Sequence, residues 1–166
     1  MTCERIFHVL FLCTGNSARS IMAEVLMNQL GQGKFLAYSA GSHPKGTVHP
    51  LAIATLQGIR LPVDGLRSKS WEEFARPDAP PLDFLFTVCD DAAAEVCPVW
   101  PGAPMTAHWG VEDPAAFAGT EEEQRKKFLE VALMLRRRIE LFINLPTAAL
   151  SSMTMQAKPH TMEQGQ

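Results

Sequence analysis

The sequence predicts an α/β fold: a single domain built on a four-stranded parallel sheet with helices on both faces. Short apolar runs rich in β-forming residues alternate along the chain with stretches in which apolar residues recur at helical spacing. This alternation is typical of parallel sheets, whose strands are covered on both faces and are therefore apolar throughout. The length of 166 residues suits one such domain.

Four apolar runs, each too short for an ordinary helix, predict the strands. They are residues 6–12, 35–40, 82–88 and 105–109. Parallel strands end at a common edge of the sheet, and the functional sites of such folds lie at that edge. Cys13 and Cys89 each follow a predicted strand directly, so we expect both side chains there.

The helices are predicted from spacing and from residues that favour helix ends. Apolar residues recur at helical spacing over 21–30, and Gly31 ends that helix. Pro50 suits the first turn of a second helix. The sequences SWEE (70–73) and TEEE (120–123) have the form of capping boxes. The last helix is expected to end near residue 144, with its core side formed by Leu129, Leu133, Ile139 and Phe142.

The C-terminal segment differs from the rest of the chain. Residues 147–166 are polar, follow Pro146 and lack periodicity. We expect them to form a flexible tail, which leaves residues 1–146 as the folded domain.

Charge and hydropathy argue against two broad classes of function. A formal net charge of −3 gives no support to nucleic-acid binding, and no apolar run approaches the length of a membrane span. The N-terminal residues do not resemble a signal peptide, so we expect a cytoplasmic protein, in which thiols stay reduced unless they do redox work. Neither the cysteines nor the histidines have metal-ligand spacing, and no metal or cofactor is predicted.

The segment Cys13-Thr-Gly-Asn-Ser-Ala-Arg19 is predicted to be an oxyanion-binding loop. It joins the end of a buried strand to the start of a helix, so its N–H groups can converge on one tetrahedral anion. Gly15 and Asn16 tolerate a left-handed backbone, and Arg19 offers a planar fork of donors. The helix dipole, the N–H groups and Arg19 favour a nucleophilic thiolate at Cys13. The residues expected to bind the oxyanion are Thr14, Gly15, Asn16, Ser17, Ala18, Arg19 and Ser20, and the Ser20 hydroxyl can also donate to the thiolate.

In its context, VLFLCTGNSARSIMAEVL, this segment resembles the signature loop of the low-molecular-weight protein tyrosine phosphatases and of the arsenate reductases related to them. The resemblance extends over residues 6–146 and includes Tyr38-Ser-Ala-Gly41 and the segment from Cys89 to Pro114. It implies a four-stranded parallel sheet with flanking helices, in agreement with the pattern of apolar runs.

Chemistry at a thiolate that attacks an oxyanion needs a proton for the departing oxygen. The segment from His108 to Pro114 carries two carboxylates. Its Asp113-Pro114 resembles the Asp-Pro of the family, whose aspartate is the general acid. The alternatives are that Asp113 only caps a helix, or that Glu112 is the acid.

Two further cysteines separate a reductase from a phosphatase. Water completes the reaction of a phosphatase, whereas a reductase supplies two electrons and needs further thiols. The segment from Cys89 to Cys97 resembles the part of thioredoxin-coupled arsenate reductases that carries their second and third redox cysteines. The alternative is a pair of buried structural cysteines. Cys3 has no counterpart in these motifs.

The chain departs from some of its relatives at a cation site. Some reductases of the family bind potassium near residues that match Asn16, Glu24 and Ser39, completed by an aspartate. Lys69 stands at the best-matching position for that aspartate. Its ammonium can take the place of the ion and pair with Glu24; the alternative is a solvated surface lysine.

The resemblance implies a function in arsenic detoxification. Arsenate binds the loop, which phosphate or sulfate also fits, and Cys13 attacks arsenic while Asp113 protonates the departing oxygen. Cys89 then attacks the Cys13 sulfur and releases arsenite. Cys97 finally attacks Cys89, and the disulfide passes to thioredoxin, or to glutathione with glutaredoxin.

Two other functions remain as alternatives. A phosphatase that hydrolyses phosphotyrosine or small phosphate esters would share Cys13, Arg19 and Asp113. Ile21 stands where the phosphatases usually have proline, and the chain lacks their tyrosine pair after Asp-Pro, so the reductase is favoured. An oxyanion-binding module is disfavoured because binding alone needs no nucleophile.

Overall fold

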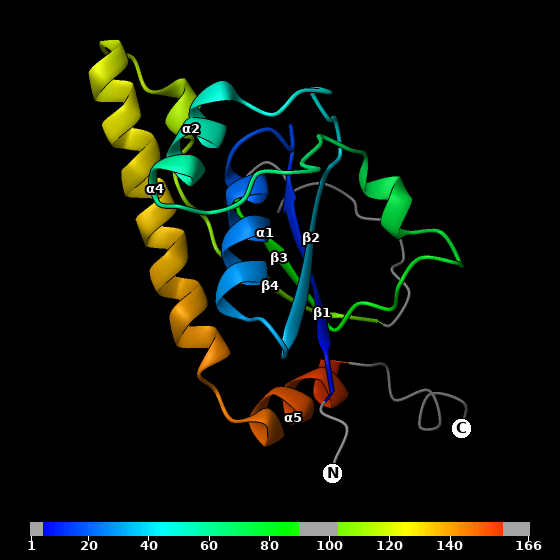
Figure 1. Ribbon diagram of the computed structural model, residues 1–166. Coiled ribbons are helices and arrows are strands. Elements are labelled where there is room, and N and C mark those ends of the chain that lie inside the picture. The colour runs from blue at the N-terminus through cyan, green and yellow to red at the C-terminus, as the bar shows by residue number, and fades with distance from the viewer. Residues whose placement is uncertain (1–4, 90–102, 158–166) are drawn as a thin grey trace.

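The computed structural model of the protein describes residues 5–89 and 103–157, which contain a four-stranded sheet (Figure 1). Its strands are β1 (Phe7–Cys13), β2 (Phe35–Gly41), β3 (Phe84–Thr87) and β4 (Met105–His108). Neighbouring strands are parallel throughout, in the order β2-β1-β3-β4. The predicted single-domain fold with four parallel strands is confirmed, and each strand overlaps its predicted range.

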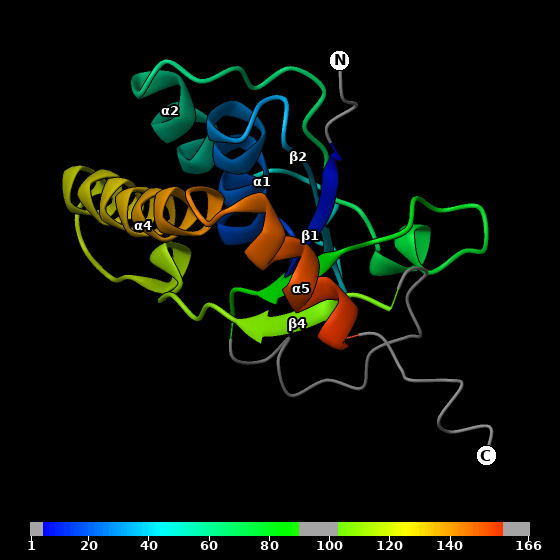
Figure 2. The same cartoon turned by 90° about the horizontal axis from the view of Figure 1, so that it is seen from below.

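Both faces of the sheet carry helical segments. Helices α1 (Arg19–Leu30), α2 (Pro50–Gly58) and α4 (Glu121–Ile143) lie on one side, and the short 3-10 helix η1 (Trp71–Phe74) lies on the other (Figures 1 and 2). Side chains alternate between the faces of a strand. Phe11 of β1 therefore joins a large core with α1 and α4, whereas Leu10 and Leu12 join a smaller core with Phe74 of η1. Since β1 is buried on both faces, the loop that follows it starts from a firmly packed strand.

The predicted ends of α4 are confirmed, but its predicted core side is partly wrong. Thr120 and Glu123 form the complete capping box, and the helix ends at Ile143. Leu129 and Leu133 are 39% and 45% exposed, whereas the expected Ile139 and Phe142 are buried. The buried stripe continues from these two residues toward the N-terminus at spacings of three and four, through Leu135, Ala132, Val131 and Phe128. The two leucines stand one position away from that stripe.

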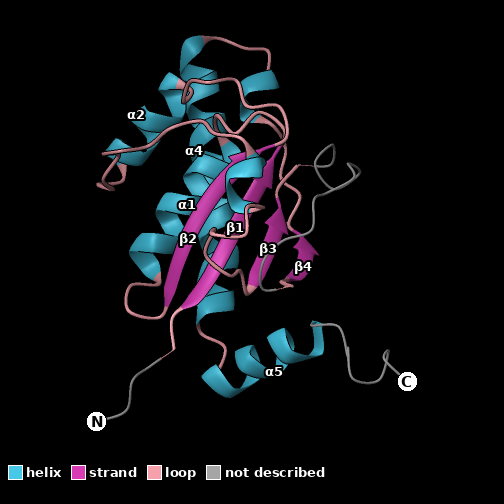
Figure 3. Ribbon diagram, turned by 90° about the vertical axis from the view of Figure 1, so that its right-hand side faces the viewer, coloured by secondary structure: helices cyan, strands magenta, loops and turns pink. Residues whose placement is uncertain are grey.

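The prediction of a flexible tail is wrong for residues 147–157, which form helix α5 (Thr147–Ala157). Figure 3 shows α5 beyond the ends at which the strands begin. Leu150 is fully buried, and the hydroxyl of the buried Thr154 donates to the carbonyl of Ser151. Residues 158–166 lie outside the described part of the chain. Over those described ranges, the structure contains no helix with the length and hydropathy needed to cross a bilayer.

Candidate active site

A pocket of about 190 Å³ lies where β1 ends and brings most of the predicted site residues together. It is lined by Cys13, Thr14, Gly15, Ser17, Ala18 and Arg19 from the loop, and by His43, Lys45 and Asp113 from two other segments. The remaining two predicted oxyanion-binding residues, Asn16 and Ser20, are fully buried, and the Asn16 amide donates to the Ser20 hydroxyl at 2.8 Å. The predicted bond from Ser20 to the thiolate stays a prediction.

The segment 43–49 holds the loop through its backbone. Three of its N–H groups donate to loop carbonyls at 2.9 Å: His43 to Thr14, Lys45 to Gly15, and His49 to Ser17. In a planar trans peptide the C=O and the N–H point in opposite directions. Each carbonyl held by this segment therefore turns the following N–H group toward the opposite side of the loop, where an anion can bind.

The left-handed backbone predicted for the loop is present at Asn16 but not at Gly15. Asn16 adopts φ 44°, in the left-handed region, but Gly15 does not have a positive φ. Gly15 is instead covered by the stem of Lys45, whose Cε would lie 3.2 Å from an added Cβ. Gly41 is more tightly constrained, because an added Cβ would lie 2.5 Å from the carbonyl oxygen of Thr14.

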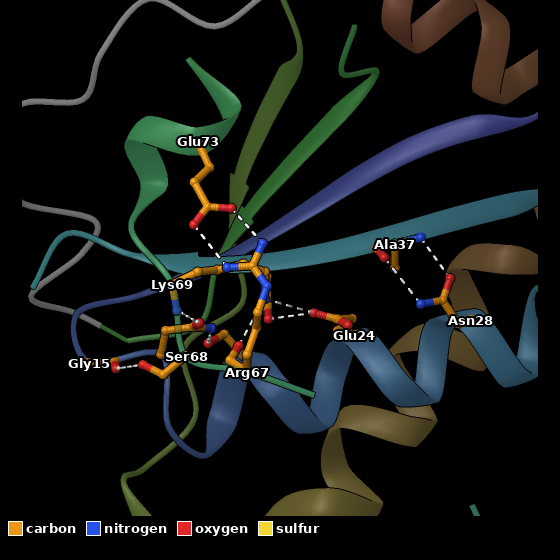
Figure 4. Close-up of polar contacts among 11 residues, drawn as sticks. Gly15, Glu24, Asn28, Ala37, Arg67, Ser68, Lys69 and Glu73 are labelled. Atoms are coloured by element: carbon orange, nitrogen blue, oxygen red, sulfur yellow. Dashed lines mark hydrogen bonds and ion pairs between the residues drawn. The ribbon is translucent and has the colours of Figure 1, made fainter. Parts of the chain in front are cut away.

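Ser68 and Lys69 make polar contacts with the loop (Figure 4). The backbone N–H of Lys69 donates to the Asn16 side chain at 2.8 Å, and the Ser68 hydroxyl donates to the carbonyl of Gly15 at 3.2 Å. The Lys69 ammonium lies 3.6 Å from the Glu24 carboxylate, which also accepts a bond from Ser39. The predicted Lys69–Glu24 pair is confirmed, and the alternative of a solvated lysine is wrong because the Lys69 side chain is only 9% exposed.

Replacing Lys69 with methionine is expected to destabilise the protein by about 1–3 kcal/mol, because a largely buried carboxylate loses its counter-charge. Burial already lowers the pKa of Lys69, and Glu24 opposes that shift, so the two groups are coupled. A double-mutant cycle with Lys69→Met and Glu24→Gln, followed by urea denaturation, measures the coupling. Strictly additive losses in the cycle would show that the ion pair contributes nothing.

The two described cysteines form a buried pair in the pocket region. Cys13 and Cys89 are 5% and 3% exposed, and the Cys89 sulfur accepts a bond from the Thr14 N–H at 3.3 Å. The hydrogen bond that the Cys13 thiol donates to the Cys89 sulfur, and then burial, raise the pKa of Cys13 well above its usual range. Arg19 and the Gly15 N–H lower it, as predicted, but the opposing causes are larger. The contributions of Arg19 and the loop N–H are thus in the predicted direction, and the adjacent Cys89 opposes them, because two adjacent buried sulfurs do not both ionise. The role of Cys13 as the nucleophile stays a prediction.

Asp113 is placed on the pocket by the segment that follows β4. Trp109 stacks on Phe86 with 3.9 Å between ring centroids, and Arg19 donates to the carbonyl of Val111 at 3.0 Å. The Asp113 carboxylate lies 3.7 Å from the Arg19 guanidinium and also accepts the N–H of Ala115, which caps the short 3-10 helix η2 (Pro114–Ala116). Asp113 therefore does cap a short helix with one carboxylate oxygen, and its other carboxylate oxygen faces Arg19.

Two other predicted site residues have different outcomes. Glu112, the alternative acid, pairs with Lys127 at 3.1 Å and does not line the pocket. Cys97 lies outside the described residues. Sequence reasoning missed Lys45, although a signal was available: it follows β2, which ends at the same edge of the sheet as β1.

Comparison with known proteins shows a consistent group of relatives. The family model described as low molecular weight phosphotyrosine protein phosphatase matches residues 8–153. An arsenate reductase from Oceanobacillus iheyensis is 36% identical over 134 residues, and one from Bacillus subtilis is 34% identical; each match covers 81% of this chain and 93% of the relative. A solved structure of an arsenate reductase in the phosphate-binding state is 28% identical, with a TM-score of 0.66, covering 82% of this chain and 96% of that one.

Proposed function

The chain belongs to the low molecular weight phosphotyrosine protein phosphatase family, and from this premise we propose that it reduces arsenate to arsenite. Its relatives named arsenate reductase match over four fifths of its length. The observation that carries the proposal is the second buried thiol, Cys89, hydrogen-bonded to Cys13. A phosphatase completes its reaction with water and has no use for a thiol at this position. The proposed role is the removal of arsenate from the cytoplasm.

In the first step, arsenate is held by the N–H groups of the loop and by the Arg19 guanidinium. The Cys13 thiolate attacks arsenic, and Asp113 gives its proton to the oxygen that leaves as water. Binding of the dianion adds negative charge beside the sulfurs, which is balanced by the loop dipoles and Arg19. This assignment is supported by the common pocket that Cys13, Arg19 and Asp113 line.

In the second step, the Cys89 thiolate attacks the sulfur of Cys13. The sulfur–arsenic bond breaks, its electron pair stays on arsenic, and arsenite leaves. Two thiols are thereby oxidised to a disulfide while arsenic gains two electrons. The Thr14 N–H, which donates to the Cys89 sulfur, supports the thiolate that this attack requires.

In the third step, we propose that Cys97 attacks Cys89 and frees Cys13. The support for this step is the position of Cys97, eight residues after Cys89 and close enough along the chain to reach it. An external thiol carrier then reduces the Cys89–Cys97 disulfide. Thioredoxin is the proposed carrier, and glutathione with glutaredoxin is the alternative.

A coupled assay tests the proposed function. The purified protein is incubated with arsenate, NADPH, thioredoxin and thioredoxin reductase, and arsenite is separated by chromatography and quantified. A parallel reaction with glutathione, glutathione reductase and glutaredoxin identifies the carrier. Arsenite formation in step with NADPH oxidation is expected; no arsenite with either reductant would reject the proposal.

Asp113→Asn is expected to slow the first chemical step by about 10²–10⁴-fold, as for the loss of a general acid. Asparagine keeps the oxygen that accepts the Ala115 N–H, so the fold and the binding of oxyanion should be preserved. Single-turnover rates of arsenite release measure the effect, and isothermal titration with phosphate checks binding. Glu112→Gln is the matched control. A near-normal rate for Asp113→Asn would move the acid to another residue.

A further inference from the structure

A cation stands at the pocket in addition to Arg19. Lys45 lines the pocket, and its backbone N–H donates to the carbonyl of Gly15 at 2.9 Å. Its stem crosses the loop at Gly15, since an added Cβ there would lie 3.2 Å from Cε and 3.3 Å from Cγ. The backbone and the stem of this side chain therefore lie against the anion loop, and the residue lines the pocket although it is exposed.

The charge of Lys45 acts on His49, which belongs to the same segment. It lowers the pKa of His49, after burial, whereas Asp113 raises that pKa. Lys45 and Asp113 thus both lie close enough to His49 to act on it electrostatically. The other group lining the pocket from this segment is His43.

The shape of a tetrahedral anion decides what Lys45 meets. Three oxygens can bond the loop N–H groups and Arg19, and the fourth points away from the loop. In arsenate or phosphate that fourth oxygen is small and can accept a bond from an ammonium. In a phosphate ester it carries an organic group, which would compete with Lys45 for the same space. Of the residues that the structure describes, no Phe, Tyr or Trp lines the pocket to receive such a group.

We propose that Lys45 is a specificity-determining residue that binds the fourth oxygen of an inorganic, doubly charged oxyanion and so favours arsenate over phosphate esters. This inference rests on the proposed function and names the form of substrate that the site takes. Lys45 acts on binding and carries no proton or electron in the reaction.

Titration calorimetry tests the inference with two probes, inorganic phosphate and phenyl phosphate, in a Cys13→Ser background so that the ester is not hydrolysed. Lys45→Met, which keeps the stem and removes the charge, is expected to weaken phosphate about tenfold and phenyl phosphate by less than about twofold. Lys45→Arg should stay within about threefold of the parent for phosphate. Lys126→Met, which removes an exposed lysine that does not line the pocket, is the matched control.

The outcomes separate this inference from the proposed function. Equal weakening of both probes, or the same weakening by Lys126→Met, would overturn the role of Lys45, because a general loss of positive field affects both ligands alike. In the otherwise unchanged enzyme, Lys45→Met should raise KM for arsenate by a larger factor than it lowers kcat. An unchanged KM refutes the inference while the reductase assignment stands. Lys45-dependent phosphate binding without any arsenite formation supports the inference and refutes the reductase.

Discussion

Cys89→Ser is expected to stop arsenate reduction while the protein still hydrolyses a chromogenic aryl phosphate. Cys89 acts only after Cys13 has bonded to arsenic, whereas hydrolysis ends with water and does not involve it. The Cys89 thiol is also the largest cause that raises the pKa of Cys13. Its removal should lower that pKa, so that iodoacetamide alkylates Cys13 faster at neutral pH than in the parent protein.

The three readouts for Cys89→Ser are thioredoxin-coupled turnover, release of the coloured product from the aryl phosphate, and mass spectrometry of alkylated peptides. Cys3→Ser is the matched control, because Cys3 has no place in the proposed relay. Sustained arsenite production by Cys89→Ser would remove Cys89 from the relay. Loss of both reduction and hydrolysis would instead indicate that the serine disturbs the loop, and weakened phosphate binding in a titration would identify that case.

Cys13→Ser is expected to reduce both arsenate reduction and ester hydrolysis by more than about 10³-fold, because a serine hydroxyl does not ionise near neutral pH. Phosphate binding should survive, since the loop N–H groups and Arg19 remain in place. Arsenite release in a single turnover measures the first activity, and nitrophenol release from nitrophenyl phosphate measures the second. Residual reduction above a few per cent of the parent rate would exclude Cys13 as the nucleophile.

The part of the site that could be predicted is encoded in one continuous stretch. Cys13 ends a buried strand and Arg19 begins a helix, so the loop between them follows from local pattern alone. The meeting of Cys13 and Cys89 at one edge could also be predicted, because β1 and β3 are parallel neighbours whose paired positions end at Leu12 and Thr87.

The features that could not be predicted depend on contacts between distant segments. The raised pKa of Cys13 needs the approach of Cys89 within hydrogen-bonding reach, which strand order alone does not give. The place of Lys45 depends on backbone bonds to a loop that precedes it by about thirty residues. Helix α5 gives a weak hydrophobic signal in the sequence, because one of its buried positions is the polar residue Thr154. Thr154 can be buried because its hydroxyl donates to a carbonyl of the same helix.

The way in which residues 43–49 hold the loop has a consequence for evolution and for protein engineering. The loop is held by hydrogen bonds from the backbone N–H groups of His43, Lys45 and His49. Almost any residue type supplies such an N–H group equally well. The cradle for the anion and the side chains that border it are therefore separable parts. Other residue types at positions 43 and 45 should therefore leave the backbone hydrogen bonds to the anion-binding loop intact. A library confined to these two positions should change which oxyanions or esters are accepted while most of its members still fold.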